Sequence, residues 1–191
     1  MAKKSADDAL LAECEPYFPD GVRTIAQFAR HTQEVVRAAV DKHWASLVEA
    51  LGLPEDDITL LDYWCPDKLQ KAKPTDEICI GVKLKVSDLF EAGIYRYWEV
   101  EDEKATGIDA YTWIKGRTKL DQLSKAIDDL PDAPPEPEGS WEFFTGTNGT
   151  FFIRRVLGDA DIGQLDLRLD ELITYYIRLL TNIGGMQKYL K

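Results

Sequence analysis

Two neighbouring segments with strand periodicity constrain the fold more than any other part of the sequence. In residues 78–86, branched apolar residues alternate with Cys, Gly and Lys, which is typical of a strand with one buried face. Residues 93–101, GIYRYWEVE, alternate in the same way after the short break SDLFEA. The two segments therefore predict adjacent strands of one antiparallel sheet.

Helical periodicity before these strands predicts one long helix. The pair Thr24 and Gln27 has the form of a capping box, and apolar positions then recur every three or four residues as far as Leu51. Gly52 predicts the end of this helix. A short helix is predicted before it, over residues 5–15.

The remaining elements are weaker but consistent. Residues 110–115 predict a third strand, and residues 118–130 and 161–183 predict a middle and a closing helix from apolar spacings of three and four. Residues 54–77 are predicted mostly as loop, in which residues 58–64 can form a short strand.

A hairpin, WEFFTGT-NG-TFFIRRV, is predicted over residues 141–156. Asn148-Gly149 favours a two-residue type I′ turn because both residues tolerate positive φ. With that turn, the predicted cross-strand pairs are Glu142 with Arg155, Phe143 with Arg154 and Phe144 with Ile153.

These elements predict an α+β fold: a single antiparallel sheet of about five strands, long N- and C-terminal helices and one middle helix. The length of 191 residues suits one domain. We expect residues 1–20 to form an N-terminal arm and residues 21–191 a single domain. The Pro-rich segment 131–139 is expected to be an extended connector within it, because only a hairpin and a helix follow.

The charge balance separates classes of partner. Lys and Arg total 23 against 34 Asp and Glu, a formal net charge of −11. This charge repels a phosphate backbone at long range and attracts a protein partner with a basic surface, so nucleic acid is an unfavoured partner. No apolar run approaches the ~20 residues that span a bilayer, and no signal peptide is visible. We expect a cytoplasmic protein without a membrane segment.

Signals for catalysis, cofactors and metals are weak. His31 and His43 are twelve residues apart, too far to share a metal within one helix. The three cysteines lack CxxC spacing, and no phosphate-binding loop motif occurs. Nucleases of the PD-(D/E)xK type need an acid two residues before the lysine, but Gly81 stands two before Lys83. We expect no catalytic residue, cofactor or metal.

Acidic residues gather in two stretches. Residues 99–109 hold five acids and one lysine, and residues 121–142 hold seven acids and one lysine. Carboxylates on a rigid scaffold can occupy a basic groove, although most acidic runs are solvated faces. The predicted docking residues are Glu101, Asp102, Glu103, Asp128, Asp129, Asp132, Glu136 and Glu138.

The second face of the predicted sheet offers another surface. Lys83, Lys85, Tyr95 and Tyr97 share it in the predicted alternation. Lysines interleaved with aromatic residues on an open sheet can stack nucleic-acid bases. The same pattern suits a face that helices cover, where the tyrosines belong to the core, and we favour that interpretation.

A helix ending near His43-Trp44, the strand GIYRYWEVE, the helix TKLDQLSKAIDDL, a strand at Trp141-Glu142, a hairpin and a closing helix follow one another over residues 40–183. This order resembles a family of small domains of unknown function found in bacterial defence-associated proteins, some of which carry a nuclease-like domain. The resemblance implies an α+β fold and a defence or mobile-element context. It transfers no catalytic residues.

The sequence leaves three functions open. Our prediction is a non-enzymatic protein-interaction domain, adaptor or inhibitor-like, with an acidic docking surface, in bacterial defence or phage counter-defence. One alternative is a nucleic-acid-binding module built on the Lys and Tyr face. The other is a divergent metal-dependent nuclease-like domain that uses Asp67, Glu99 or Glu101 with Lys83 or Lys85.

Overall fold

The computed structural model describes residues 15–64, 77–88, 90–99, 106–115, 117–129, 141–145, 150–158, 161 and 163–190. The strands are β1 (Thr59–Trp64), β2 (Glu77–Ser87), β3 (Phe90–Glu99), β4 (Thr106–Ile114), β5 (Trp141–Thr145) and β6 (Thr150–Val156). The helices are α2 (Phe18–Leu51), α4 (Arg117–Asp128) and α6 (Leu165–Asn182), with short 3₁₀ turns η1 (Glu15–Tyr17), η2 (Glu55–Asp57) and η3 (Gln187–Tyr189).

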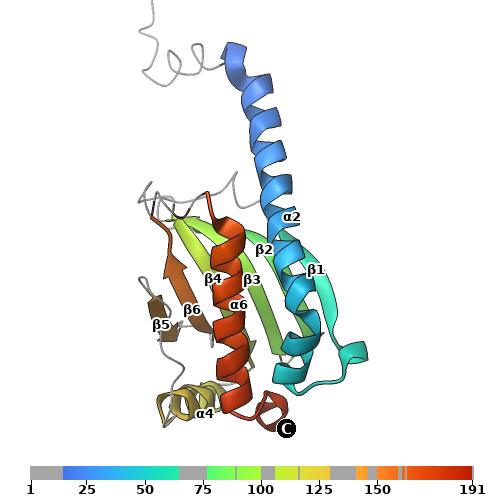
Figure 1. Ribbon diagram of the computed structural model, residues 1–191, viewed down its shortest axis with the longest axis vertical. Helices are drawn as coiled ribbons and strands as arrows, with labels where there is room; N and C mark the ends of the chain where they lie inside the picture. The colour runs from blue at the N-terminus through green and yellow to red at the C-terminus, as the bar shows by residue number, and fades with distance from the viewer. Residues whose placement is uncertain are drawn as a thin grey trace, which may run out of the picture.

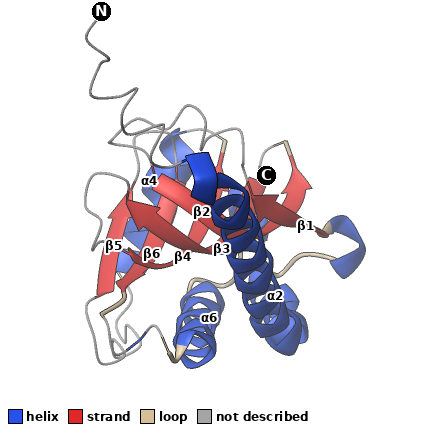
Figure 2. Ribbon diagram, turned by 90° about the horizontal axis from the view of Figure 1, so that it is seen from above, coloured by secondary structure: helices blue, strands red, loops and turns tan. Residues whose placement is uncertain are grey.

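One antiparallel sheet organises these elements, with strand order β1-β2-β3-β4-β6-β5. Figure 1 shows α2 and α6 side by side on one face of the sheet, and α4 beyond its lower end. The view from above in Figure 2 places both long helices on the same side of the strands. The predicted α+β class is therefore confirmed, and β1 is the edge strand that brings the sheet to six strands.

The apolar core lies between the sheet and the two long helices. Val82 pairs with Ile94, and both are fully buried on the helix-covered face. The alternation is confirmed for the described side chains of β2, where Lys85 is exposed on the other face, whereas β3 is buried on both faces from Ala92 to Tyr97. Leu47 of α2 and Leu172 of α6 are buried in the same cluster. Leu123 of α4 joins this cluster and closes the end of the core beyond β4.

The long N-terminal helix begins earlier than predicted. It starts at Phe18, so Thr24 lies inside α2 and does not cap it. Pro19 explains the difference: it occupies the first turn, where its missing N–H would have no helical partner in any case. The predicted end is confirmed, because Gly52 caps the helix in the left-handed conformation with φ 67°. The predicted helix over 5–15 lies outside the described residues, apart from Glu15.

The hairpin of β5 and β6 forms, but its predicted register is wrong by one residue. Glu142 pairs with Arg154, and Phe143 pairs with Ile153. Ile153 is fully buried, and in this register the backbone of Phe143 pairs with it in place of that of Phe144. The predicted turn at Asn148-Gly149 lies outside the described residues.

Candidate functional site

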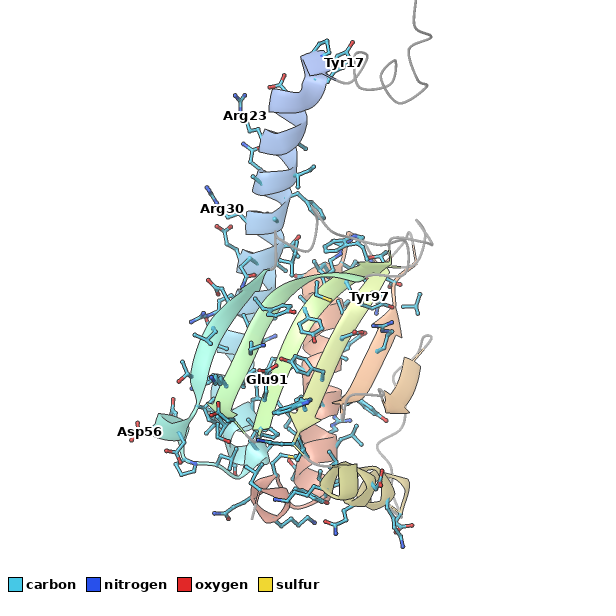
Figure 3. All side chains as sticks on the ribbon, turned by 180° about the vertical axis from the view of Figure 1, so that it is seen from behind. Tyr17, Arg23, Arg30, Asp56, Glu91 and Tyr97 are labelled. Carbon is cyan, nitrogen blue, oxygen red and sulfur yellow. The ribbon has the colours of Figure 1, made fainter. Side chains whose placement is uncertain are left out.

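Figure 3 views the face of the sheet that is turned away from α2 and α6. Three tyrosines on this face each lie opposite a glycine of the next strand: Tyr95 opposite Gly81, Tyr111 opposite Gly93 and Tyr97 opposite Gly107. A Cβ at Gly93 would lie 2.0 Å from the Tyr111 ring, and one at Gly107 would lie 2.5 Å from the Tyr97 ring. Gly93 and Gly107 therefore leave the space that a tyrosine ring occupies, whereas Gly81 allows close approach of the β3 backbone.

The four residues predicted as a nucleic-acid-binding face lie on this side of the sheet, but Lys85 pairs with Glu91, six residues along β3 from Tyr97. Lys83 and Lys85 are half-buried and exposed, respectively. Tyr95 is only 9% exposed and Tyr97 only 1%. Stacking of bases requires an accessible ring face. The tyrosines of this face therefore form a packed layer, although none of the described helices lies over it in Figure 3.

A buried ion pair closes one side of this layer. Arg154 donates from Nε to Asp109 Oδ1 at 2.9 Å and from a terminal nitrogen to Oδ2 at 2.7 Å. The guanidinium carbon of Arg154 also lies 3.8 Å from the centre of the Tyr97 ring. Both charged groups are buried, and the two parallel hydrogen bonds between them offset the free-energy cost of removing them from water. This arrangement covers the Tyr97 ring with a cation that is already paired.

A second polar chain runs across the other side of the face. Tyr111 donates its hydroxyl to Glu91 at 2.6 Å, and Lys83 Nζ lies 2.9 Å from the same carboxylate. The Tyr95 ring lies between Tyr63 and Tyr111, with ring centres 5.6 and 5.0 Å away. Burial raises the pKa of Tyr95 and of Tyr111, and the bond to Glu91 raises the second one further. Both hydroxyls therefore stay protonated at neutral pH and act as neutral groups.

The predicted acidic docking residues lie mostly outside the described part of the chain. Asp129 directly follows α4 and is exposed, and the backbone of Asp128 forms the last residue of that helix. The residues outside are Glu101, Asp102, Glu103, Asp132, Glu136 and Glu138. Asp129 is therefore the one predicted docking side chain whose exposure the structure shows.

The residues of the nuclease alternative are not assembled into a site within the described chain. Lys83 forms an ion pair with Glu91, and Nζ of Lys85 lies 3.8 Å from Oδ1 of Asp88. Asp67 and Glu101 fall outside the described residues. Among the residues that the structure describes, no three His, Cys, Asp or Glu side chains gather in a way that could hold a metal ion.

His43 has a structural position between the two long helices. Its Nε2 lies 2.6 Å from Asp170 Oδ1, and Lys42 Nζ donates to the same oxygen at 2.7 Å. Lys42, and then His43, hold the pKa of Asp170 below its usual range. This cluster joins α2 to α6. The other histidine, His31, is exposed.

The N-terminal part of α2 projects beyond the sheet. At 1.5 Å per residue, the 34 residues of α2 span about 51 Å, and Figure 1 shows its upper turns standing clear of the strands. Every described side chain over residues 20–28 is exposed, and burial begins at Ala29. Tyr17, Ile25 and Phe28 are large apolar side chains in this region, with Ile25 58% exposed. We call residues 18–28 the projecting segment.

Arg96 lies at the foot of the projecting segment. It is 6% exposed, and its guanidinium carbon lies 4.7 Å from the centre of the Trp98 ring and 5.6 Å from that of Phe28. The two rings meet edge to face at 5.5 Å. Burial lowers the pKa of Arg96. No carboxylate among the described residues pairs with it, and its Nε is buried without a hydrogen-bond partner.

Sequence reasoning missed both features. The periodicity of α2 indicates which positions share an apolar side, but it does not reveal where the sheet that covers this side ends. Arg96 shares its strand face with Ile94 and Trp98, and a charged residue in that apolar alternation was the available signal.

Comparisons with known proteins return no relative. No family model, no curated protein and no solved structure matches this chain. Within the described residues, no helix combines the length and the apolar character that a membrane span requires.

Proposed function

We propose that this protein is a non-enzymatic protein-interaction domain, of adaptor or inhibitor type, that docks on a protein partner through the projecting segment of α2. The observation that carries the proposal is the exposure of Ile25 and Phe28 on a helix that extends past the body of the protein, with exposed Tyr17 directly before that helix. Large exposed apolar side chains that lie near one another are typical of interaction sites.

The geometry of the segment suits helix-mediated recognition. Ile25 and Phe28 are three residues apart and therefore lie on the same side of α2. Amphipathic helices are commonly recognised through apolar anchors at this spacing. The polar residues Arg23 and Gln27 lie on the opposite side, about 160° around the helix from Ile25. The segment thus presents one apolar and one polar side.

The acidic docking surface belongs to the same proposal. Asp129 and Asp121 are exposed at α4, far along the molecule from the projecting segment in Figure 1. The net charge of −11 favours a partner with a basic surface facing these residues. The setting in bacterial defence or phage counter-defence rests on the resemblance of element order alone.

A pull-down with matched variants tests the proposal. The tagged chain is incubated with a lysate of its native cells after nuclease treatment, across a salt series, and bound proteins are identified by mass spectrometry. Ile25→Asp places a charge on the apolar side of the segment, whereas Gln27→Asp places the same charge on the polar side. We expect the first variant to lose a stoichiometric protein partner and the second to retain it. Equal retention by both variants contradicts docking through this segment.

A further inference from the structure

We propose that Arg96 is an anion-recognition residue that receives a carboxylate from the partner when the partner packs on Ile25 and Phe28. The partner segment is then both apolar and acidic: apolar side chains cover the projecting segment, and one carboxylate reaches the guanidinium at its foot. This inference rests on the proposed function and names the chemistry of the segment that the site takes.

The first argument is the missing partner of Arg96. Two arginines of the sheet, Arg96 and Arg154, are equally buried, at 6% exposed. Arg154 has the carboxylate of Asp109, held by two hydrogen bonds. Arg96 has two aromatic rings and, within the described chain, no carboxylate and no hydrogen bond. A buried cation without an anion is costly and rare, so its retention points to an anion that is supplied from outside.

The second argument is the direction from which an anion could reach it. Of the three guanidinium nitrogens of Arg96, only Nε is both fully buried and without a partner. The terminal nitrogens have no hydrogen bond within the described chain and are not among its fully buried atoms without a partner, which indicates contact with solvent. They are the pair of donors that a carboxylate engages with both of its oxygens. The Nε side of the Arg96 guanidinium is therefore buried, whereas its two terminal nitrogens, which can bind an anion, are open to solvent.

The third argument is the wall of the site. Phe28 and Trp98 flank the guanidinium, and Phe28 is also one of the exposed apolar residues of the projecting segment. One side chain thus belongs both to the apolar docking surface and to the arginine site. A partner that covers Phe28 also shields Arg96 from water, and a carboxylate delivered at that moment forms a stronger, desolvated pair.

Protein carboxylate fits these surroundings better than a nucleic-acid phosphate. Both anions can bind a guanidinium, but the net charge of −11 repels a polyanion at long range. The neighbours of the site are apolar side chains, which suit a polypeptide surface more than a sugar–phosphate backbone. A peptide segment is also able to supply apolar contacts and a single charge together.

Two synthetic peptides test the inference directly. The first is a short amphipathic helical peptide of Leu, Ala and Gln with a single Glu, and the second has Gln in place of that Glu. Binding is measured by titration into the full-length protein, and the Nε–Hε signal of Arg96 is followed by nuclear magnetic resonance. The signal is assigned by its loss in Arg96→Met. A single-stranded oligonucleotide and inorganic phosphate serve as further probes.

We expect the Glu peptide to bind about ten- to a hundredfold more tightly than the Gln peptide and to shift the Arg96 signal, because a charge-assisted hydrogen bond is worth this much. Arg96→Met should bind both peptides equally, at the weaker affinity. Arg96→Lys keeps the charge but not the planar fork, and should recover only part of the difference. Circular dichroism confirms that each variant is folded before it is titrated.

The outcomes separate the two proposals. If wild-type protein binds both peptides equally and Ile25→Asp abolishes both, Arg96 has no anion role and the projecting segment still docks. If neither peptide binds or moves the Arg96 signal, the carboxylate inference is overturned. If oligonucleotide or phosphate shifts the signal as strongly as the Glu peptide, the carboxylate assignment is wrong and phosphate takes its place. If Ile25→Asp binds like Gln27→Asp, the projecting segment is not the docking site.

Discussion

Replacing Arg96 by Met should raise the stability of the free protein, whereas the same replacement at Arg154 should lower it sharply. The two positions form a matched pair: both are arginines of the sheet, and both are 6% exposed. They differ in their partners, because Arg154 is bound to Asp109, whereas among the described residues Arg96 contacts the rings of Phe28 and Trp98 and no carboxylate. Met is chosen because it keeps most of the side-chain length and packs well against aromatic rings.

The expected magnitudes follow from these contacts. Arg154→Met leaves the fully buried carboxylate of Asp109 without its cation, which costs about 3–5 kcal/mol. Arg96→Met removes an unsatisfied buried donor, whose penalty is about 1–3 kcal/mol. It also removes two cation–π contacts of about 0.5–1 kcal/mol each, which sulfur–aromatic contacts partly replace. The net gain for Arg96→Met is therefore about 1 kcal/mol, or about 2–4 °C in Tm for a chain of this size.

Urea unfolding followed by circular dichroism measures both changes, provided that the slope with urea is the same for all three proteins. The two variants should differ by about 4–6 kcal/mol in unfolding free energy, with wild type in between. A loss of about 3 kcal/mol or more in Arg96→Met would refute the reasoning, because it would mean that Arg96 is compensated in the free protein like Arg154.

Three further predictions test other parts of the structure. Gly81→Ala should lower the unfolding free energy by about 1–3 kcal/mol, because its Cβ would lie 2.1 Å from the carbonyl oxygen of Ile94. The control Gly163→Ala has nothing within 4 Å of its Cβ and should change the unfolding free energy by less than about 0.5 kcal/mol, as measured by urea unfolding. Asp170→Asn should lower the unfolding free energy by up to about 1 kcal/mol at pH 7. Because the pKa of Asp170 is lowered, this difference in stability should persist down to about pH 4 and disappear as pH falls through the lowered pKa. A difference that does not vary with pH contradicts the ion pair with Lys42 and His43. Asp129→Lys should weaken a partner complex that decays with salt, with Glu49→Lys as an exposed control on α2; equal affinities argue against the acidic surface.

The sequence predicted what depends on local periodicity. In β2 the side chains of Val82 and Leu84 are buried and that of Lys85 is exposed, as the alternation predicted, whereas β3 is buried on both faces from Ala92 to Tyr97. The alternation also placed Arg96 on the same strand face as Ile94 and Trp98. The end of α2 was readable because Gly52 alone supplies the left-handed cap. Its start was misread, because Pro19 fits a first turn as well as a break.

Features that depend on pairing between distant segments could not be predicted. The tyrosine layer requires that Gly93 face Tyr111 and Gly107 face Tyr97, and this register is set by the whole sheet. The hairpin pairs Ile153 with Phe143 and not with Phe144, a register that the local turn signal did not predict. That Arg154 meets Asp109, while Arg96 meets no carboxylate in the described part of the chain, likewise depends on three-dimensional neighbours and cannot be read from composition.

The continuity of α2 affects what the projecting segment loses on binding. A free helix of about eleven residues would be marginal in water, since nucleation is costly. Here the turns that pack in the core continue without interruption into residues 18–28, and the one proline of the helix lies in its first turn. The core therefore nucleates the docking helix and fixes its direction before any partner arrives. The projecting segment therefore loses little backbone entropy when a partner binds, and the free energy of its contacts is reduced only slightly by the cost of ordering the helix.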